Sequence, residues 1–482
     1  MNRSRSNIVA LAAVAALALQ GCHDQSTPTA PAARILAASV TPADPAGRHL
    51  VVFTAGRVPA DFGERAAQLG GVVGASLDSI GVAAVTGLSD GAAAELAAGT
   101  DIRAVEPDVA MPLPNEDVAA DGAAADEAVS EALAPADATA SPTTAQFYAR
   151  QWNLRAVFAP EAWAAGHLGS RDVKVAILDT GIDYANPDLA GLVDLGRSIS
   201  LVPEDVTRHY PGRLPFSDLF WHGTAVASVV ASNAKVLAGV NRYVTFLAVK
   251  IADSTGLRTT ASLLLNGIVY ATDQGADVIN TSNGLEFDKS AHPGIMAAFE
   301  RAVNYAFRKG ALLVSVPFMD GADLDHNGDL VRLPCEAANA ICVAATGPTG
   351  AAGVNGPWEN VDARAPYSAF GRSAVSVVAP GGAGEVGQFR RMWVRCTTTP
   401  TATTAAPACL ARQAVAQPVG NSFAAAHVSG LAALLVAQLG HGNPALIRAR
   451  ILQTADDLGE PGTDPYYGKG RINIARALEL IN

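Results

Sequence analysis

The sequence predicts an α/β protein in which a parallel β-sheet is covered by helices on both faces. From residue 151 onward, strand-like segments alternate with helical segments, as expected when parallel strands are joined by helical crossovers. Several of these strand-like segments are apolar throughout, which indicates strands buried on both faces. The 482 residues are 49% hydrophobic and 16% charged, a balance typical of a globular protein with a substantial core.

Each element of the larger unit follows from its local pattern. Short apolar, β-branched runs predict strands, and longer runs with helical periodicity predict helices. Gly275 and Gly310 follow two of the helical runs, and glycine commonly ends a helix. The predicted strands are residues 173–178, 244–251, 277–280, 311–316, 340–345 and 374–379, and the main helices are 260–274, 294–309 and 422–439.

A smaller α/β unit is predicted at residues 49–111, ahead of the larger one. Strands at 49–53, 82–85 and 102–108 alternate with helices at 61–69 and 90–98, an order that fits a compact α/β sandwich.

Two segments around this unit lack apolar periodicity. Residues 112–147 are rich in alanine and acidic residues and predict a disordered linker, where proteolysis concentrates. Residues 23–48 are rich in Ala, Pro and Thr and predict a flexible tether.

The N-terminus predicts export. Two arginines precede an uninterrupted apolar run at residues 8–19, which is typical of a signal peptide and short for a membrane span. The segment 19–22, Leu-Gln-Gly-Cys, is similar to a bacterial lipobox, so residues 1–22 are interpreted as a lipoprotein signal with Cys22 as the lipidation site. A lipid would tether the protein to a membrane without a spanning helix. We expect an outer-membrane or cell-surface protein, or one released after processing; a plain secretory signal with an incidental cysteine is the alternative.

Four further cysteines form two local pairs, Cys335 with Cys342 and Cys396 with Cys409. Export to an oxidising compartment favours disulfides, although the sequence alone does not fix the connectivity. Metal binding is the rival interpretation, but the spacings match no compact zinc pattern. We therefore predict disulfides and no metal at these cysteines.

The charge balance excludes nucleic acid as a partner. The formal net charge is −11, and no run of Lys and Arg suggests a basic face. Binding to phosphates requires such a face.

Three short motifs carry the residues of a nucleophilic site. Asp179 follows the strand 173–178, His222 stands before a helix of small residues, and Ser422 opens a long apolar helix. Serine is a weak nucleophile that needs a base, and the base needs an orienting carboxylate. These residues therefore predict a catalytic triad. Asp-Thr-Gly also occurs in aspartic proteases, but those need a second such motif, which this chain lacks.

The order and contexts of the three motifs resemble the subtilisin family of serine proteases. Segments 151–154, 159–163, 378–381 and 468–473 are also similar to recurring family segments. The resemblance implies a three-layer subtilisin-like peptidase domain over residues 148–482. It also implies that residues 49–111 are an inhibitory propeptide that assists folding and is cut away within the linker.

The resemblance implies a serine endopeptidase acting on proteins or peptides, and we expect no cofactor. Ser282, Asn283 and Gly284 lie where the family pairs with its substrate as an added strand. A lipoprotein esterase would also use a triad, but the order and flanks of these motifs fit it poorly.

Two departures from the family pattern concern the stabilisation of an oxyanion. The family has an asparagine donor where this chain has Met319, whose side chain has no donor. Asn421 replaces the usual threonine before the nucleophile, and its amide is a candidate substitute donor; the alternative is that Asn421 only caps the helix. The missing donor favours a second hypothesis, a pseudoprotease that acts as a surface peptide-binding module.

Calcium is not supported as a cofactor. Residues 323–334 have the oxygen-ligand spacing of a calcium loop, but Pro334 stands where a bidentate glutamate is expected. The family's usual calcium loop is also shortened, at residues 232–239.

Overall fold

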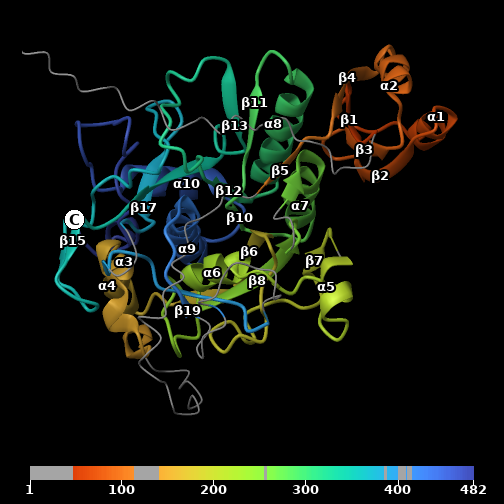
Figure 1. The fold of residues 1–482 in the computed structure, drawn as a ribbon. Helices are drawn as coiled ribbons and strands as arrows, with labels where there is room; N and C mark the ends of the chain where they lie inside the picture. Colours follow the sequence, from red (N-terminus) through yellow and green to blue (C-terminus); the bar gives the residue numbers. More distant parts are fainter. Residues whose placement is uncertain are drawn as a thin grey trace, which may run out of the picture. The chain divides into compact units, whose positions relative to one another are not determined.

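The computed structural model describes residues 47–112, 141–202, 204–254, 258–384, 388–399, 409 and 415–481. At the centre of the larger unit is a seven-stranded sheet in the order β17-β14-β12-β10-β6-β8-β7, in which all neighbouring strands are parallel (Figure 1). The predicted parallel α/β sheet is therefore confirmed. Its strands are β6 (Gly169–Asp179), β7 (Ile199–Ser200), β8 (Tyr243–Lys250), β10 (Val278–Thr281), β12 (Leu312–Ser315), β14 (Ile341–Thr346) and β17 (Val377–Pro380).

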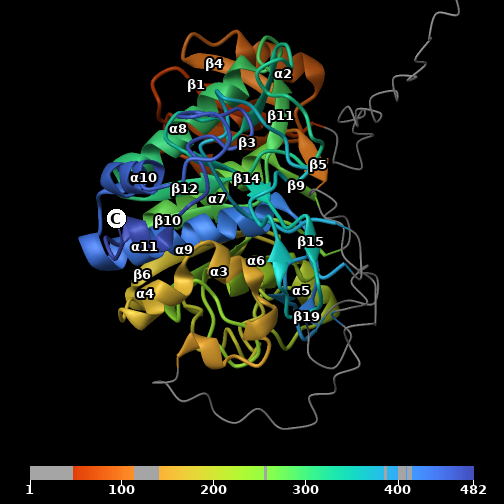
Figure 2. The ribbon, with the colours of Figure 1, turned by 90° about the vertical axis from the view of Figure 1, so that its left-hand side faces the viewer.

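Helices cover both faces of this sheet, as the apolar strands predicted. Successive side chains of β6 point to opposite faces, so Val175 and Ile177 join one hydrophobic cluster and Ala176 and Leu178 join another. The first cluster lies under α6 (His222–Val230) and α9 (Asn421–Leu439). The second lies under α7 (Ala261–Asp273) and α8 (Pro293–Arg308). Figure 2 shows these helices along the sheet from the side.

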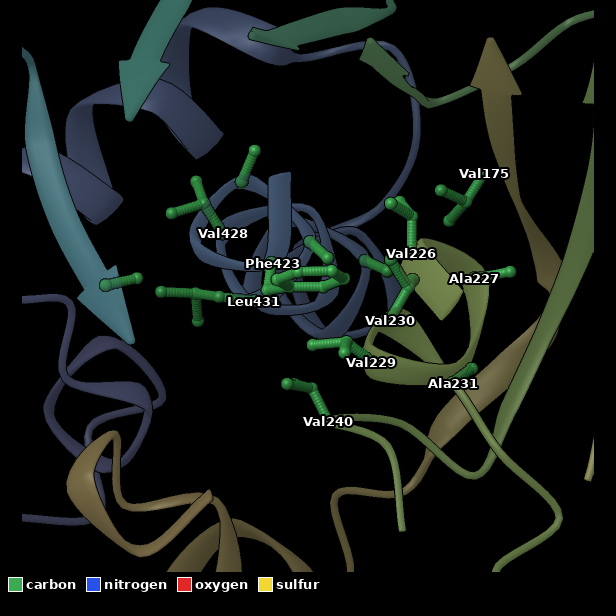
Figure 3. Close-up of a cluster of buried hydrophobic side chains, with 14 of the residues drawn as sticks. Val175, Val226, Ala227, Val229, Val230, Ala231, Val240, Phe423, Val428 and Leu431 are labelled. Carbon is green, nitrogen blue, oxygen red and sulfur yellow. The ribbon is translucent and has the colours of Figure 1, made fainter. Parts of the chain in front are cut away.

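Helix α9 is the central core helix of the first cluster. Phe423, Val428 and Leu431 of α9 belong to the same cluster as Val226, Val229 and Val230 of α6, and the ring of Phe423 points toward α6 (Figure 3). A Cβ at Gly430 would lie 2.6 Å from Cβ of Val240, so glycine permits the close approach of that segment. The length and apolarity of α9 would suit a membrane span, but most of the helix is buried within the domain.

Shorter elements surround the three layers. They comprise α3 (Trp152–Ala156), α4 (Ala159–Ala164), α5 (Glu204–His209), α10 (Pro444–Gln453) and α11 (Ile474–Ala477), and the strand pairs β11 (Leu285–Asp288) with β13 (Leu330–Leu333), β15 (Gly350–Ala351) with β16 (Trp358–Glu359), and β18 (Val394–Arg395) with β19 (Val415–Ala416).

The peptidase unit begins earlier than predicted. Residues 141–147, assigned to the linker, contain the 3₁₀ helix η2 (Pro142–Thr144), and a second 3₁₀ helix, η3 (Tyr148–Arg150), follows. The N–H of Phe147 donates to Val236 O at 2.9 Å, and the Phe147 side chain is buried. Tertiary packing against the segment around Val236 orders these residues, and local composition does not reveal such packing.

The smaller unit forms an antiparallel four-stranded sheet in the order β2-β3-β1-β4. Strand β2 was not predicted, because its residues alternate between exposed and half-buried along the edge of the sheet. The short strand β5 (Ala110–Pro112), which follows this four-stranded sheet, pairs antiparallel with β9 (Arg258–Thr260) of the larger unit. The elements of the smaller unit are β1 (His49–Phe53), α1 (Phe62–Gln68), β2 (Val72–Leu77), β3 (Val82–Thr86), α2 (Asp90–Ala97) and β4 (Ile102–Pro107).

Both local cysteine pairs are bonded. Cys335 is joined to Cys342 and Cys396 to Cys409, with Cα–Cα distances of 4.7 and 5.4 Å. The predicted signal with Cys22, nearly all of the predicted tether, and the linker between residues 113 and 140 lie outside the described residues.

Candidate active site

A histidine–aspartate pair lies at the carboxyl end of β6. Nδ1 of His222 is 2.7 Å from Oδ1 and 2.8 Å from Oδ2 of Asp179, and both residues are buried. Since a carboxylate only accepts hydrogen bonds, Nδ1 carries the proton and donates it. The neutral ring then has its lone pair at Nε2. An imidazole held in this tautomer can take a proton at Nε2.

Two glycines allow the loops of this pair to approach each other. Gly223 follows His222, and a Cβ there would overlap the carbonyl oxygen of Gly181 and come within 3.2 Å of Asp179 Oδ1. Gly181 itself has a φ of +108°, which strongly favours glycine. The glycines of the Asp-Thr-Gly and His-Gly-Thr motifs are thus required by the close packing of the two loops.

Ser422 lies in the first turn of α9, and it is buried. The ring of the next residue, Phe423, has its centroid 6.2 Å from that of the His222 imidazole. The start of α9 therefore lies beside His222. The first N–H groups of a helix have no acceptor within it, and the helix dipole is positive there, which suits a developing negative charge.

The amide of Asn421 is engaged within the protein. Its Nδ2 donates to the carbonyl oxygens of Pro317 at 3.0 Å and Phe318 at 3.3 Å. In this arrangement the amide donates to these backbone carbonyls, and its donation to an oxyanion stays a prediction. Asn421 instead ties the start of α9 to the segment after β12. The next residue in that segment is the half-buried Met319. Met319 therefore lies near the start of α9, where Ser422 is.

The three predicted substrate residues lie next to the same end of the sheet. Ser282 follows the carboxyl end of β10, the neighbour of β6, and Asn283 Nδ2 donates to Leu178 O at 3.1 Å. A Cβ at Gly284 would lie 3.2 Å from the ring of the half-buried Phe318. The structure therefore gathers Ser282, Asn283 and Gly284 beside the strand that carries Asp179.

Asp218 is a buried carboxylate that the sequence analysis missed. Its Oδ1 accepts from Thr180 Oγ1 at 3.0 Å, and its Oδ2 accepts from N and Oγ1 of Thr224 at 2.9 and 2.6 Å. Thr180 Oγ1 in turn accepts from Gly223 N at 2.9 Å. Burial raises the pKa of Asp218 to about 6. This carboxyl joins the loop after Asp179 to the start of α6, and its only sequence signal is a position four residues before His222.

A second histidine on α9 is structural. Nδ1 of His427 is 2.7 Å from Phe423 O, and Nε2 is 2.9 Å from Nδ2 of Asn153. The carbonyl oxygen can only accept, so Nδ1 carries the proton and Nε2 accepts from the amide. Burial lowers the pKa of His427 to about 4, which keeps the ring neutral. Both ring nitrogens are engaged, so His427 is not a competing base.

The carboxylates of the calcium-loop-like segment have protein partners. Asp323 Oδ2 is 2.8 Å from Nδ1 of His326, and Asp325 accepts from the N–H groups of Arg372 and Ser373. Within the described ranges, no group of three or more His, Cys, Asp and Glu residues is arranged to hold a metal ion.

Comparison with known proteins decides the family. A family model for Peptidase S8, the subtilase family, matches residues 170–470. Thermitase of Thermoactinomyces vulgaris is 33% identical over 343 residues, covering 70% of this chain and 99% of that protein. This chain belongs to the subtilase family. The family match confirms the enzyme class predicted from the triad motifs, a subtilisin-like serine endopeptidase.

Further relatives agree in sequence and fold. A thermophilic serine proteinase of Bacillus sp. (strain AK1) is 31% identical over 341 residues, covering 70% of this subtilase and 69% of that protein. Among solved structures, the epidermin leader peptide processing serine protease of Staphylococcus aureus superposes with a TM-score of 0.69 at 20% identity, over 90% of this chain and 98% of that one. Fervidolysin of Fervidobacterium pennivorans gives a TM-score of 0.65 at 21% identity, over 90% and 61% of the two chains. These last two show likeness of fold alone.

Proposed function

We propose that this subtilase hydrolyses peptide bonds of proteins through an acyl-enzyme formed on Ser422. The observation that carries the proposal is the His222–Asp179 pair at 2.7 Å, beside the helix start that bears Ser422. The test is hydrolysis of casein by the purified protein and by its Ser422→Ala variant.

In this mechanism, Oγ of Ser422 attacks the peptide carbonyl carbon while Nε2 of His222 takes the hydroxyl proton. The C–N bond then breaks, and Nε2 returns the proton to the leaving amine. Asp179 holds the imidazole in the Nδ1–H tautomer and stabilises the imidazolium that forms. Water repeats the sequence on the acyl-enzyme and releases the second product.

Substrate would bind as an added strand along Ser282, Asn283 and Gly284. Such binding uses backbone hydrogen bonds, so it selects weakly among sequences. The position of these residues beside β6 and close to Phe318 supports this proposal.

We also propose that the unit at residues 49–111 is an intramolecular inhibitor. Its Glu106 accepts from the N–H groups of Gly294 at 2.7 Å and Ile295 at 3.0 Å, at the start of α8. Asp108 accepts from N and Oγ of Ser262 at 2.9 and 2.6 Å, at the start of α7. Carboxylates are stabilised at helix N-termini, so both acids hold the unit on the peptidase domain.

Apolar packing and strand pairing add to this hold. Leu50, Val52 and Val82 of the small unit share a hydrophobic cluster with Ile295 and Phe299 of α8. Strand β5 then pairs with β9, which follows β8 in the chain, and β8 is the neighbour of the Asp179 strand β6. The likeness in fold to the Staphylococcus aureus structure covers 90% of the chain. The residues from 141 onward make up a smaller share than that, so the likeness must include part of the small unit.

Removing the two helix-capping acids should release the inhibitor. Each cap contributes about 1 kcal/mol, so the double variant Glu106→Ala, Asp108→Ala should hold the unit about 30-fold less tightly. We expect the lag before casein hydrolysis begins, measured on the purified full-length chain, to shorten.

The exposed Glu64 of α1 provides the control for this experiment. The Glu64→Ala variant should keep the lag of the parent chain. A double variant with an unchanged lag would show that the small unit does not restrain the peptidase through these caps.

We further propose that the chain is exported and lipidated at Cys22. The apolar run 8–19 and the Leu-Gln-Gly-Cys segment support this proposal, and the two disulfides suit an oxidising compartment. Cells given labelled palmitate should incorporate it into the full chain and not into a Cys22→Ser variant. An unlabelled parent chain would refute the lipid anchor.

A second candidate function is a peptide-binding module with impaired catalysis. Met319 favours it, because a thioether cannot donate a hydrogen bond to an oxyanion. In that case casein would bind without being cleaved.

A further inference from the structure

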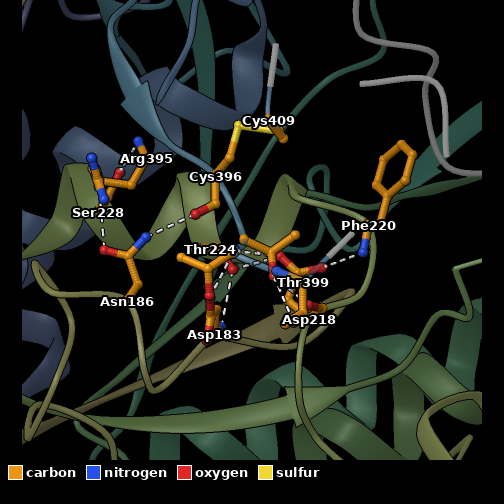
Figure 4. Close-up of a disulfide and its surroundings, with 12 residues drawn as sticks. Asp183, Asn186, Asp218, Phe220, Thr224, Ser228, Arg395, Cys396, Thr399 and Cys409 are labelled. Atoms are coloured by element: carbon orange, nitrogen blue, oxygen red, sulfur yellow. Dashed lines mark hydrogen bonds between the residues drawn. A yellow bond between two sulfur atoms is a disulfide. The ribbon is translucent and has the colours of Figure 1, made fainter. Parts of the chain in front are cut away.

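A short segment far along the chain forms hydrogen bonds with two loops and a helix that hold the His222–Asp179 pair. Residues 394–399, called the strap below, begin with β18, and Cys396 within them is joined to Cys409 (Figure 4). The strap contacts the loop after Asp179, the loop before His222, and helix α6.

The first contact is with the loop before His222. Oγ1 of Thr397 donates to the backbone oxygen of Asp218 at 2.7 Å. The carboxyl of the same Asp218 accepts from Thr180 and Thr224, the residues that follow Asp179 and Gly223. The Thr397 hydroxyl therefore fixes the backbone of the residue that ties the two catalytic loops together.

The second contact is with the loop after Asp179. Oδ2 of Asp183 accepts from N of Thr398 at 2.7 Å and from its Oγ1 at 2.6 Å. The N–H of Asp183 donates to Thr224 Oγ1 at 3.0 Å, two residues after His222. Thr398 thus holds this loop in the position where it bonds to the start of α6.

The third contact is with α6 and with the next part of the Asp179 loop. N of Arg395 donates to Ser228 Oγ at 3.1 Å, and the buried Arg395 guanidinium lies 3.3 Å from Oδ2 of Asp188. Nδ2 of Asn186 donates to Cys396 O at 2.8 Å. The backbone around the disulfide is therefore part of the network itself.

We propose that the strap, pinned by the Cys396–Cys409 disulfide, positions the His222–Asp179 pair for catalysis, with Thr397 and Thr398 as positioning residues. This inference rests on the proposed peptidase function. The strap reaches parts of the chain that precede it by far in the sequence, and a disulfide limits the freedom of such a segment. A misplacement of ~1 Å can cost about 10²-fold in rate, so modest loosening of the strap would be measurable as lost turnover.

The test compares two disulfide deletions in the full-length chain. The double variant Cys396→Ser, Cys409→Ser should lower kcat for a peptide substrate by about 10- to 100-fold, with KM nearly unchanged. The matched control, Cys335→Ser with Cys342→Ser, removes the disulfide between the end of β13 and β14 and should keep kcat. Both are assayed well below the unfolding temperature of each variant.

A milder variant covers the case in which the disulfide deletion fails to fold. Thr398→Val removes one of the two bonds to Asp183 and should lower kcat by several-fold. Thr349→Val, which removes an exposed hydroxyl that donates to Glu359 O at 3.4 Å, is its control. A merely structural strap would lower the unfolding temperature of Thr398→Val and leave kcat unchanged.

A readout without turnover separates this inference from the proposed function. In the Ser422→Ala background, the Nδ1 proton shared by His222 and Asp179 should give a far-downfield NMR signal, as short charge-assisted hydrogen bonds do. That signal should broaden or shift in Thr398→Val and not in Thr349→Val. If the parent chain hydrolyses nothing but the signal responds to the strap, the peptidase proposal fails and the positioning role stands. An unchanged signal together with unchanged kcat overturns the inference.

Discussion

Replacing Ser422 by alanine should lower peptide hydrolysis by about 10⁶-fold, the loss that deletion of the nucleophile causes in subtilisin. The physical reason is that His222 and Asp179 activate no other hydroxyl at the start of α9. With Ser422 gone, only binding and the helix-start N–H groups remain to assist attack by water. The measurement is the initial rate on casein, with the intact mass of the chain as a second readout. We expect the variant to remain full length while the parent shortens itself within residues 112–150.

The control is a second buried serine on the same helix. Ser429 Oγ donates to Asn280 Oδ1 at 2.9 Å, so Ser429→Ala removes a buried hydrogen bond without touching the His222–Asp179 pair. It should cost about 1 kcal/mol of stability and leave turnover within a few-fold of the parent. If Ser422→Ala cleaves as fast as the parent, the nucleophile lies elsewhere and the acyl-enzyme mechanism is refuted.

The strands and site positions that could be predicted are those that depend on short local sequence patterns. The strands of the central sheet are apolar on both faces, so β6, β8 and β10 could be located within a few residues. Asp179 follows one such strand directly, and parallel strands bring their carboxyl ends to one edge of the sheet. The sequence therefore predicted where the site lies as well as the residue types in it.

The parts that were not predictable depend on contacts between distant segments. Asp218 and Thr398 are ordinary polar residues in their own neighbourhoods, and only the fold shows that they bond to the loops around the triad. Asn421 is similar: its residue type suggested a donor to an oxyanion, whereas in the fold its Nδ2 donates to the carbonyls of Pro317 and Phe318. The hydrogen-bond partner of such a side chain depends on the tertiary structure and not on its neighbours in the sequence.

The hydrogen bonds of Asn421 also affect which groups can stabilise the oxyanion. With Asn421 engaged, the backbone N–H groups at the start of α9 are the donors that we assign to the oxyanion. Met319 follows Phe318, whose carbonyl is held by Asn421, so its backbone is fixed near the nucleophile while its side chain donates nothing. A donor placed at this position would act on the transition state and not on bound substrate, because the negative charge exists only there.

We therefore expect Met319→Asn to raise kcat by about 10²-fold, the size of the effect that one such donor has in subtilisin. Met319→Leu keeps the apolar character without a donor and should leave kcat unchanged, which separates hydrogen bonding from packing. KM should be similar in all three proteins, measured with one peptide substrate at saturation. A parent that binds peptide without cleaving it, together with an active Met319→Asn, would identify the natural protein as the binding module. If Met319→Asn is no faster than Met319→Leu, position 319 does not face the oxyanion, and the backbone N–H groups of α9 alone supply its stabilisation.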